Sequence, residues 1–181
     1  SVLFICLLLL SIFSITLING LFLEKYYVSK KVEVLEEAKE VLSQMNLDDI
    51  LKYDTDSESD SGEAAGEIPD EIERSSSRNN LTWIIVNEEN SGYYYWGENN
   101  MSKMLRSKLF GYINNLHQDM ERGHVIKQTD TCTMWQVHDR FAGMEYVECW
   151  GQFDNGYYFL IRSPLESIKE SASISNSFYF V

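Results

Sequence analysis

This chain of 181 residues is short of positive charge. It carries 15 lysine and arginine residues against 28 aspartate and glutamate residues, which gives a formal net charge of −13 at pH 7. Proteins that bind nucleic acids neutralise phosphates with lysine and arginine, so this balance disfavours DNA or RNA as a partner. Much of the acidic charge falls in residues 54–73, where Ser and Gly also recur and Arg74 is the nearest opposing charge. Such a segment buries little apolar surface, and we expect 47–80 to be an acidic flexible linker.

Residue patterns that hold metals or perform catalysis are also scarce. The three histidines are His117, His124 and His138, and no close pair of His, Cys or Asp ligands accompanies them. The acidic spacing after Asp54 fails as a calcium-binding loop because Ser59 stands where a glycine is needed. The chain has no Gly-rich phosphate loop, nucleophile elbow or zinc-protease helix. We therefore expect no metal ion, no cofactor and no catalytic residue, and the chain is not itself an enzyme.

Charge is absent altogether from residues 2–23. An α-helix rises about 1.5 Å per residue, so this apolar run can cross a hydrocarbon core of about 30 Å. A cleaved signal peptide has a shorter apolar region, about 7–15 residues, and small residues before its cleavage site, a pattern that is missing here. The sequence predicts a transmembrane helix over 1–23, which places the protein in the cell membrane.

The helical pattern continues beyond this run, over 24–46. Apolar residues recur there at spacings of three and four, which places them on one face of a helix. They are Val28, Val32, Leu35, Ala38, Leu42 and Met45. We expect the membrane helix to continue outward as a stalk helix. Its apolar stripe packs either on the domain's own sheet or on the same stripe of a second chain in a homodimer, and the sequence does not separate the two.

From Leu81 onward the chain is predicted to form strands around one central helix. Runs of aromatic and β-branched residues bounded by turn residues are typical of strands. Such runs occupy 81–86, 93–96, 124–129, 131–139, 144–153 and 156–162. Between the second and third runs, Leu105, Leu109 and Tyr112 belong to the apolar face of an amphipathic helix.

The last strand is predicted to run directly into a capped helix. Ser163 is an N-cap candidate, Pro164 suits the first helical position, and Glu166 completes a capping box. Arg162, Ser163, Pro164 and Glu166 would then form a rigid joint. Residues 164–181 become more apolar toward Val181, so we interpret them as an exit helix leading into a second transmembrane helix. An ordinary connection within a soluble domain is the alternative.

The order of elements is helix, two strands, helix, three antiparallel strands in a meander, and exit helix. This order predicts an α+β domain over 81–163, with a five-stranded antiparallel sheet and its helices on one face. It resembles the extracytoplasmic PAS-like (Cache-type) sensor domain. In addition, Tyr158–Ser171 is similar to the end of the sensor region in bacterial membrane-bound histidine kinases.

The resemblance implies a function. The chain would be the extracytoplasmic signal-sensing region of a two-component sensor histidine kinase, with residues from about 24 to 172 outside the cytoplasm. It would respond to an unknown small-molecule or peptide stimulus and reach a response regulator through a kinase core that this chain lacks. Alternatives are the sensor region of a chemoreceptor or cyclic-dinucleotide enzyme, and a membrane-tethered interaction domain with no signalling output.

In a PAS-like fold a ligand lies between the sheet and the overlying loops. Aromatic residues suited to line such a pocket, with Arg140 or Arg162 to recognise an anion, are Tyr94, Trp96, Trp135, Trp150 and Tyr158. Aromatic residues are also common in cores and on sheet surfaces, so ordinary packing is the alternative.

Cys132 and Cys149 lie in neighbouring predicted strands. A two-residue turn at Arg140 and Phe141 would place them directly opposite each other, and a four-residue loop would place them diagonally on the same face. An outward-facing domain is a compartment where a disulfide persists, so the pair is either a disulfide or two separate buried thiols.

Overall fold

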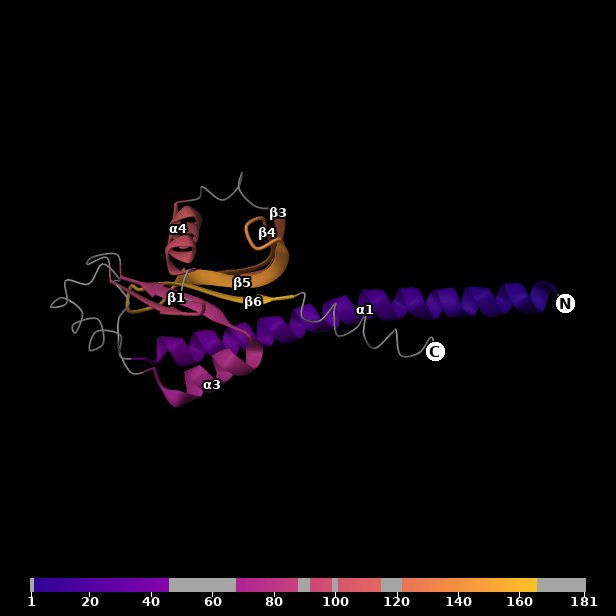
Figure 1. Cartoon of the computed structure of the whole chain (residues 1–181), viewed down its shortest axis with the longest axis horizontal. Helices are drawn as coiled ribbons and strands as arrows, with labels where there is room; N and C mark the ends of the chain where they lie inside the picture. Colours follow the sequence, from indigo (N-terminus) through magenta and orange to yellow (C-terminus); the bar gives the residue numbers. More distant parts are fainter. Residues whose placement is uncertain (1, 46–67, 88–91, 99–100, 115–121, 166–181) are drawn as a thin grey trace.

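The computed structural model describes residues 2–45, 68–87, 92–98, 101–114 and 122–165 (Figure 1). The helices in this part of the chain are α1 (Val2–Ser43), α3 (Asp70–Asn79) and α4 (Ser102–Ile113). The strands are β1 (Thr82–Val86), β2 (Tyr93–Trp96), β3 (Arg122–Gln128), β4 (Cys132–Asp139), β5 (Met144–Gln152) and β6 (Tyr158–Pro164). The predicted α+β class is confirmed.

The six strands form one antiparallel sheet in the order β2-β1-β6-β5-β4-β3. The expected count of five was wrong. The edge strand β3 pairs with β4, with a bulge between Val125 and Lys127, although its described residues are mostly exposed. The last strand of the described residues, β6, inserts between β1 and β5. The C-terminal end of the described chain is therefore held in the middle of the sheet.

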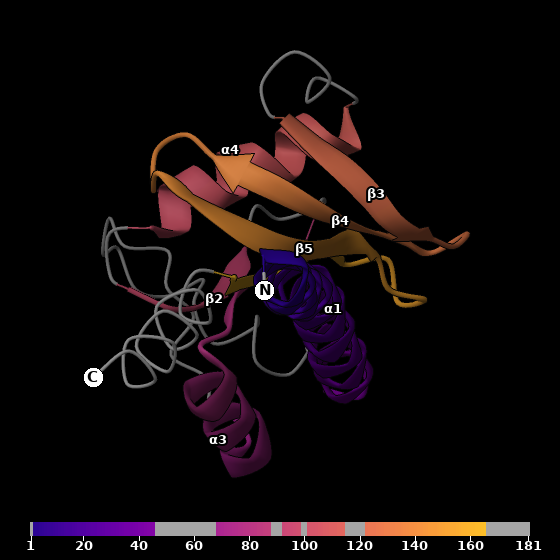
Figure 2. The same ribbon diagram turned by 90° about the vertical axis from the view of Figure 1, so that its right-hand side faces the viewer.

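Helices cover both faces of the sheet. Figures 1 and 2 show α4 on one face and α1 with α3 on the other. Along β1, Trp83 and Ile85 join the core under α1, while Ile84 and Val86 join the core under α4. The prediction that the helices lie on one face was wrong. The reason is visible in β1, where consecutive apolar residues bury both sides of the strand.

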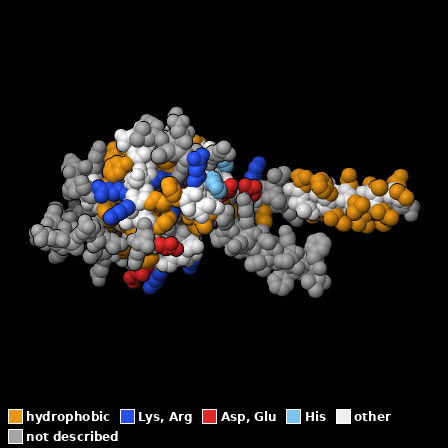
Figure 3. All heavy atoms as spheres, turned by 45° about the horizontal axis from the view of Figure 1, so that its top comes forward, with side chains coloured by type: hydrophobic (Ala, Val, Ile, Leu, Met, Phe, Trp, Pro, Cys, Tyr) orange, Lys and Arg blue, Asp and Glu red, His pale blue; other side chains and the backbone are white. Residues whose placement is uncertain are grey.

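Helix α1 has two contrasting parts. Its N-terminal apolar residues are exposed, and Figure 3 shows hydrophobic side chains covering the end that projects away from the sheet. By length and composition α1 can cross a membrane. Further along, Leu35 and Leu42 are fully buried, and Ala38 and Met45 join them in the core. The stripe of the predicted stalk thus packs on the domain's own sheet, which was one of the two alternatives.

Part of the predicted linker is folded. The segment Asp70–Asn79 forms α3, whose first turn carries acidic side chains at the positive end of the helix dipole. Ile72 and Ser76 are buried against the rest of the domain. The remainder of the expected linker, 47–67, lies outside the described residues. The linker prediction was therefore wrong for α3, because Ile72 and Ser76, four residues apart, lie on one side of the helix and are buried there.

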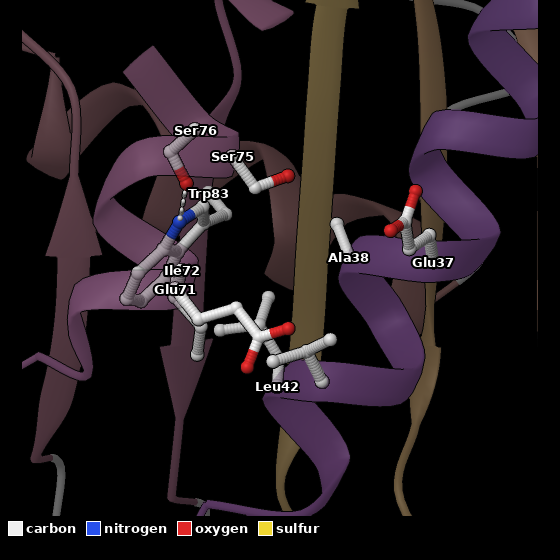
Figure 4. A pocket seen from close by; sticks show the side chains of 9 residues that line it. Glu37, Ala38, Leu42, Glu71, Ile72, Ser75, Ser76 and Trp83 are labelled. Carbon is white, nitrogen blue, oxygen red and sulfur yellow. Dashed lines mark hydrogen bonds between the residues drawn. The ribbon is translucent and has the colours of Figure 1, made fainter. Parts of the chain in front are cut away.

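Figure 4 shows how α3 is attached. A cavity of about 20 Å³, roughly the room for one water molecule, lies between α1, α3 and β1. Ala38 and Leu42 line it from α1 and Ile72 lines it from α3. The indole Nε1 of Trp83 donates a hydrogen bond of 3.1 Å to Ser76 Oγ. Helices α1 and α3 therefore form one layer that packs on β1.

The end of β6 differs from the prediction. Pro164 was expected to begin a helix, but it is the last residue of β6 and pairs with Tyr146 of β5. Beyond it, the Leu165 amide donates to the Glu145 carbonyl at 2.8 Å, so the sheet pairing extends past the proline. A proline fits the end of a strand because it needs no ladder donor there. Glu166 and the rest of the expected exit helix lie outside the described residues.

Candidate functional site

Four buried charged side chains lie between the sheet and α4. Lys108 of α4 approaches Glu148 at 2.7 Å and Asp139 at 3.4 Å, and Arg162 approaches Asp139 at 2.9 Å. Their side chains are at most 9 % exposed. Two cations thus balance two carboxylates. Burying charges is costly unless each one is paired, so this ionic network joins α4 to β4 and β5, and joins β4 to β6.

The sheet register brings these residues together. Glu148 pairs with Arg162 across β5 and β6, and with Trp135 across β4 and β5. Glu148 also accepts hydrogen bonds from Tyr112 Oη at 2.6 Å and from Trp135 Nε1 at 3.3 Å. This carboxylate is therefore held from the helix, the neighbouring strand and the lysine at once.

Asp139 is held at the start of the β4–β5 turn. Its Oδ1 accepts from the backbone amides of Phe141 at 2.9 Å and Ala142 at 3.1 Å. Burial on its own would raise the pKa of Asp139, but Lys108, the two amides and Arg162 outweigh it and lower the pKa below its ordinary value. Asp139 is therefore ionised at neutral pH and links the turn to Arg162.

A groove of about 730 Å³ lies beside Arg162 at the end of the sheet. Its lining includes Tyr146, Thr82, Trp96 and Met101. The Arg162 guanidinium sits 4.2 Å from the centroid of the Tyr146 ring, a cation–π contact. The Nε of Arg162 is buried and has no hydrogen-bond partner among the described residues. Because Nε is not accessible to solvent, an acceptor on a molecule in this groove would reach it only after the side chains around Arg162 had moved.

The six residues predicted to bind a ligand are not brought together. Trp96 lines the groove, whereas Arg140 is exposed in the β4–β5 turn. Trp135, Trp150 and Tyr158 lie on the α4 face, and Tyr94 faces α1. The Tyr112 ring packs at 5.0 Å from the Trp135 ring and at 5.3 Å from the Trp150 ring. Alternation along β2 separates Tyr94 from the aromatic cluster under α4.

On the opposite face, the end of β6 contacts the stalk part of α1. Lys31 Nζ donates to Ser163 Oγ at 2.8 Å and to the Asn79 carbonyl at 3.4 Å. Ser163 Oγ in turn donates to the same carbonyl at 3.0 Å. Burial lowers the pKa of Lys31. Ser163 therefore joins α1, the end of α3 and β6, a role that differs from the helix cap predicted for it.

Arg162 and Ser163 are consecutive residues on opposite faces of one central strand. Arg162 belongs to the ionic network and lines the groove, and Ser163 contacts the long apolar helix. We call Lys31, Asn79, Arg162 and Ser163 the β6 junction. A displacement of β6 along its length would therefore change contacts on both faces of the sheet.

The register of the two cysteines is also settled. Asp139 pairs with Met144, so residues 140–143 form the four-residue loop and the diagonal arrangement is confirmed. Cys132 pairs with Gly151, and Cys149 pairs with Met134, on the face toward α1. Both thiols are free and buried in this structure.

Across the described residues no group of three or more His, Cys, Asp or Glu side chains is arranged to hold a metal ion. Comparison with known proteins gives no relative to argue from. No family model, no curated protein and no solved structure matches this chain.

Proposed function

We propose that this chain is the extracytoplasmic signal-sensing region of a membrane-bound two-component sensor histidine kinase. The observation that carries the proposal is that two consecutive residues at the end of β6 make contacts on opposite faces of the sheet. Arg162 lies beside a groove on one side, and on the other side Ser163 bonds to the helix that carries the apolar run. A sensor of this kind needs such a connection between a binding surface and a membrane segment.

The proposed transmission begins in the groove. A stimulus that offers an acceptor to Arg162 Nε competes with Asp139 for the guanidinium, or draws it away from the Tyr146 ring. Either change pulls on β6, which is hydrogen-bonded on both sides by β1 and β5. Packed elements switch between discrete arrangements, so a small shift in β6 would move its contact with Lys31 by a step.

The chain leaves the sheet next to α1. Leu165 is the last described residue, and the neighbouring Ser163 already contacts Lys31. A second membrane helix formed after residue 165 would therefore start close to the first. This proximity supports transmission by a relative shift or rotation of two adjacent membrane helices. It is also compatible with a homodimer, in which the two helix pairs would form a four-helix bundle.

The coding sequence beyond Val181 tests the proposal most simply. We expect a second apolar run of about 20 residues, then a signalling coil, a phosphoacceptor histidine and an ATP-binding core. A chemoreceptor output or a cyclic-dinucleotide enzyme in that place would contradict the kinase assignment while keeping the sensing role. A stop codon soon after Val181 would contradict both and favour a tethered interaction domain.

A biochemical test follows in the full-length protein. Vesicles containing the protein should show autophosphorylation. The double variant Lys31→Met with Ser163→Ala should show a level of phosphorylation that differs from that of the wild type, because β6 no longer contacts α1 through these side chains. Lys30 is exposed and contacts only Glu33 among the described residues, so Lys30→Met is the matched control. Equal phosphorylation in all three proteins would contradict transmission through the β6 junction.

A further inference from the structure

Cys132 and Cys149 form a thiol pair with polar surroundings. They are diagonal neighbours on β4 and β5, on the face covered by α1. Lys39 of α1 places its Nζ 3.7 Å from Cys132 Sγ, and Thr129 Oγ1 lies 3.3 Å from the same sulfur. Although Cys132 belongs to the hydrophobic cluster under α1, a cation and a hydroxyl therefore lie beside its sulfur, and such neighbours favour a reactive thiolate.

The surroundings favour the thiolate of Cys132. The Cys149 thiol lowers the pKa of Cys132 most, against the effect of burial, and Thr129 and Lys39 lower it further, to about 5. The pKa of Cys149 is raised well above its ordinary value, first by the neighbouring Cys132 and then by burial. One sulfur is thus prepared as a nucleophile and the other remains protonated beside it, as in pairs that exchange disulfides.

The surroundings of Cys132 limit access to its sulfur and bring β4 and β5 close together. Cys132 is 6 % exposed, and the partly exposed Lys39 side chain lies against its sulfur, so a small molecule reaches this sulfur when Lys39 turns away. Gly151 stands opposite Cys132, where a Cβ would come within 2.1 Å of the Thr131 carbonyl oxygen. The two strands are therefore closely apposed at this point, and no other residue type fits.

We propose that Cys132 and Cys149 are a reversible dithiol site that reacts with low-molecular-weight disulfides of the glutathione type. The Cys132 thiolate attacks the S–S bond of the oxidant, forms a mixed disulfide and releases one thiolate. Cys149 gives up its proton, attacks Cys132 Sγ and releases the second thiolate. Two protein thiols are oxidised by two electrons, and one external disulfide becomes two thiols.

Closing this bond requires movement. Diagonal neighbours on a sheet have Cα atoms about 7–8 Å apart, beyond the usual 4.4–6.8 Å of a disulfide. The strands β4 and β5 must therefore shift relative to each other, and a bond formed at the cost of such a shift is more easily reduced. The diagonal register of the two cysteines is therefore the reason that we expect their disulfide to be reversible.

Oxidation also removes a contact of α1. The thiolate that faces Lys39 disappears, and this part of the helix keeps its ion pair between Glu36 and Lys127 of β3. We expect the C-terminal end of α1 to loosen from the sheet in the oxidised form. The role of the dithiol as a stimulus rests on the proposed sensing function, whereas its chemistry does not.

The chemistry is tested on the purified protein in detergent, in a Cys6→Ser background that leaves the pair as its only cysteines. The protein is equilibrated in mixtures of reduced and oxidised glutathione, and free thiols are counted by the mass added by a maleimide. Both thiols should disappear together and return in excess reduced glutathione. A disulfide that survives this reduction, or thiols that never react, would overturn the proposal.

The pH profile separates a prepared nucleophile from a merely accessible thiol. Alkylation of Cys132 by iodoacetamide, in the Cys149→Ser and wild-type proteins, should follow the thiolate. In the wild type the midpoint should lie near pH 5. It should rise in Cys149→Ser and in Lys39→Met, and stay unchanged in Lys30→Met. A wild-type midpoint near the ordinary value of 9.0 would overturn the assignment of Cys132 as the attacking sulfur.

The role as a stimulus is tested separately, by autophosphorylation of the full-length protein in the same glutathione mixtures. A change in phosphorylation that follows the oxidation of the pair and is lost in Cys149→Ser supports it. An unchanged level overturns the role as a stimulus and leaves the sensing proposal standing. Failure of the sensing proposal would show in the coding sequence beyond Val181 and would leave the thiol titration unaffected.

Discussion

The two faces of the sheet are built differently. Under α4, buried charges, tyrosine and tryptophan form a cross-linked polar network within an aromatic core. Under α1, the core is mainly aliphatic and aromatic, and polar contacts join the helix to the strands through Lys31 with Ser163, Lys39 with Cys132 and Glu36 with Lys127. Each of these contacts lies where α1 crosses a strand. From this comparison we infer that α1 is held to the sheet less firmly than α4, so that α1 is the helix expected to shift.

The largest effect is expected from breaking the network under α4. Arg162→Met leaves Asp139 with Lys108 as its remaining cation, in a site that is almost fully buried. Removing one partner of a buried ion pair costs about 3–5 kcal/mol. Urea unfolding of the full chain in detergent measures the loss. Arg140→Met is the control, because Arg140 is exposed in the adjacent turn and should change the stability by less than about 0.5 kcal/mol.

A loss nearly as large is expected from the aliphatic core under α1. Leu42→Ala removes a side chain that is 0 % exposed and should cost about 2–5 kcal/mol. The same change at Leu23, in the exposed part of the helix, should leave the unfolding of the sheet domain unaltered. Urea unfolding followed by tryptophan fluorescence compares the two. Equal losses at both positions would contradict the division of α1 into a packed and an unpacked part.

Acid should weaken the α4 face selectively. The pKa of Asp139 is lower in the folded chain than in the unfolded chain, so its charged form contributes stability that is present above the unfolded pKa of about 3.9. This contribution is lost as pH falls through the folded pKa. Asp139→Asn removes the dependence, so below pH 4 the variant should lose less stability than the wild type. Unfolding midpoints measured between pH 3 and pH 7 check this, and parallel curves would refute it.

The smallest effect on stability is expected from the contact between Ser163 and Lys31. Ser163→Ala removes one hydrogen bond to Lys31 and one to the Asn79 carbonyl, and should cost about 1–3 kcal/mol because Lys31 stays partly buried without its hydroxyl partner. Replacing Lys31 by Met in the same chain removes the unpaired charge and should recover part of the loss. Urea unfolding of the single and double variants gives both values. A double variant as unstable as the sum of its parts would contradict this contact.

The local structure was largely predictable from the sequence. The strand runs after Leu81 all form strands within one or two residues of their expected bounds, because alternating and β-branched runs leave few other choices. The stalk stripe also packs as its spacing indicates. The helix face under Leu105, Leu109 and Tyr112 is buried as predicted.

Long-range features were not predictable. The ionic network depends on the register that pairs Glu148 with Arg162 and on the side of the sheet that α4 covers, and a single sequence specifies neither. Two signals were nevertheless present. Lys31 precedes Leu35 by four residues and so falls within the apolar stripe of the stalk, and Glu148 stands between the inward-facing Tyr146 and Trp150. A charged residue at a core-facing position indicates a buried partner.

The joint after β6 was misplaced for a physical reason. The capping signature at Ser163, Pro164 and Glu166 is a local preference. In the folded chain the Ser163 hydroxyl instead accepts a hydrogen bond from Lys31 and donates one to the Asn79 carbonyl. Pairing with β5 then carries the strand through Pro164. Tertiary contacts outweighed a local preference worth about 1 kcal/mol.

The central claim is that β6 connects the groove side of the sheet to α1, and a double-mutant cycle tests it without knowledge of the stimulus. Arg162→Met and Lys31→Met change residues on opposite faces, and no hydrogen bond or ion pair between the two residues is found in the described chain. Unfolding free energies of the wild type, both single variants and the double variant give the coupling. We predict a coupling above about 0.5 kcal/mol, with additivity for the control pair Arg162→Met and Leu42→Ala. Additivity of Arg162→Met with Lys31→Met, within about 0.3 kcal/mol, would show that the strand does not connect the two sides.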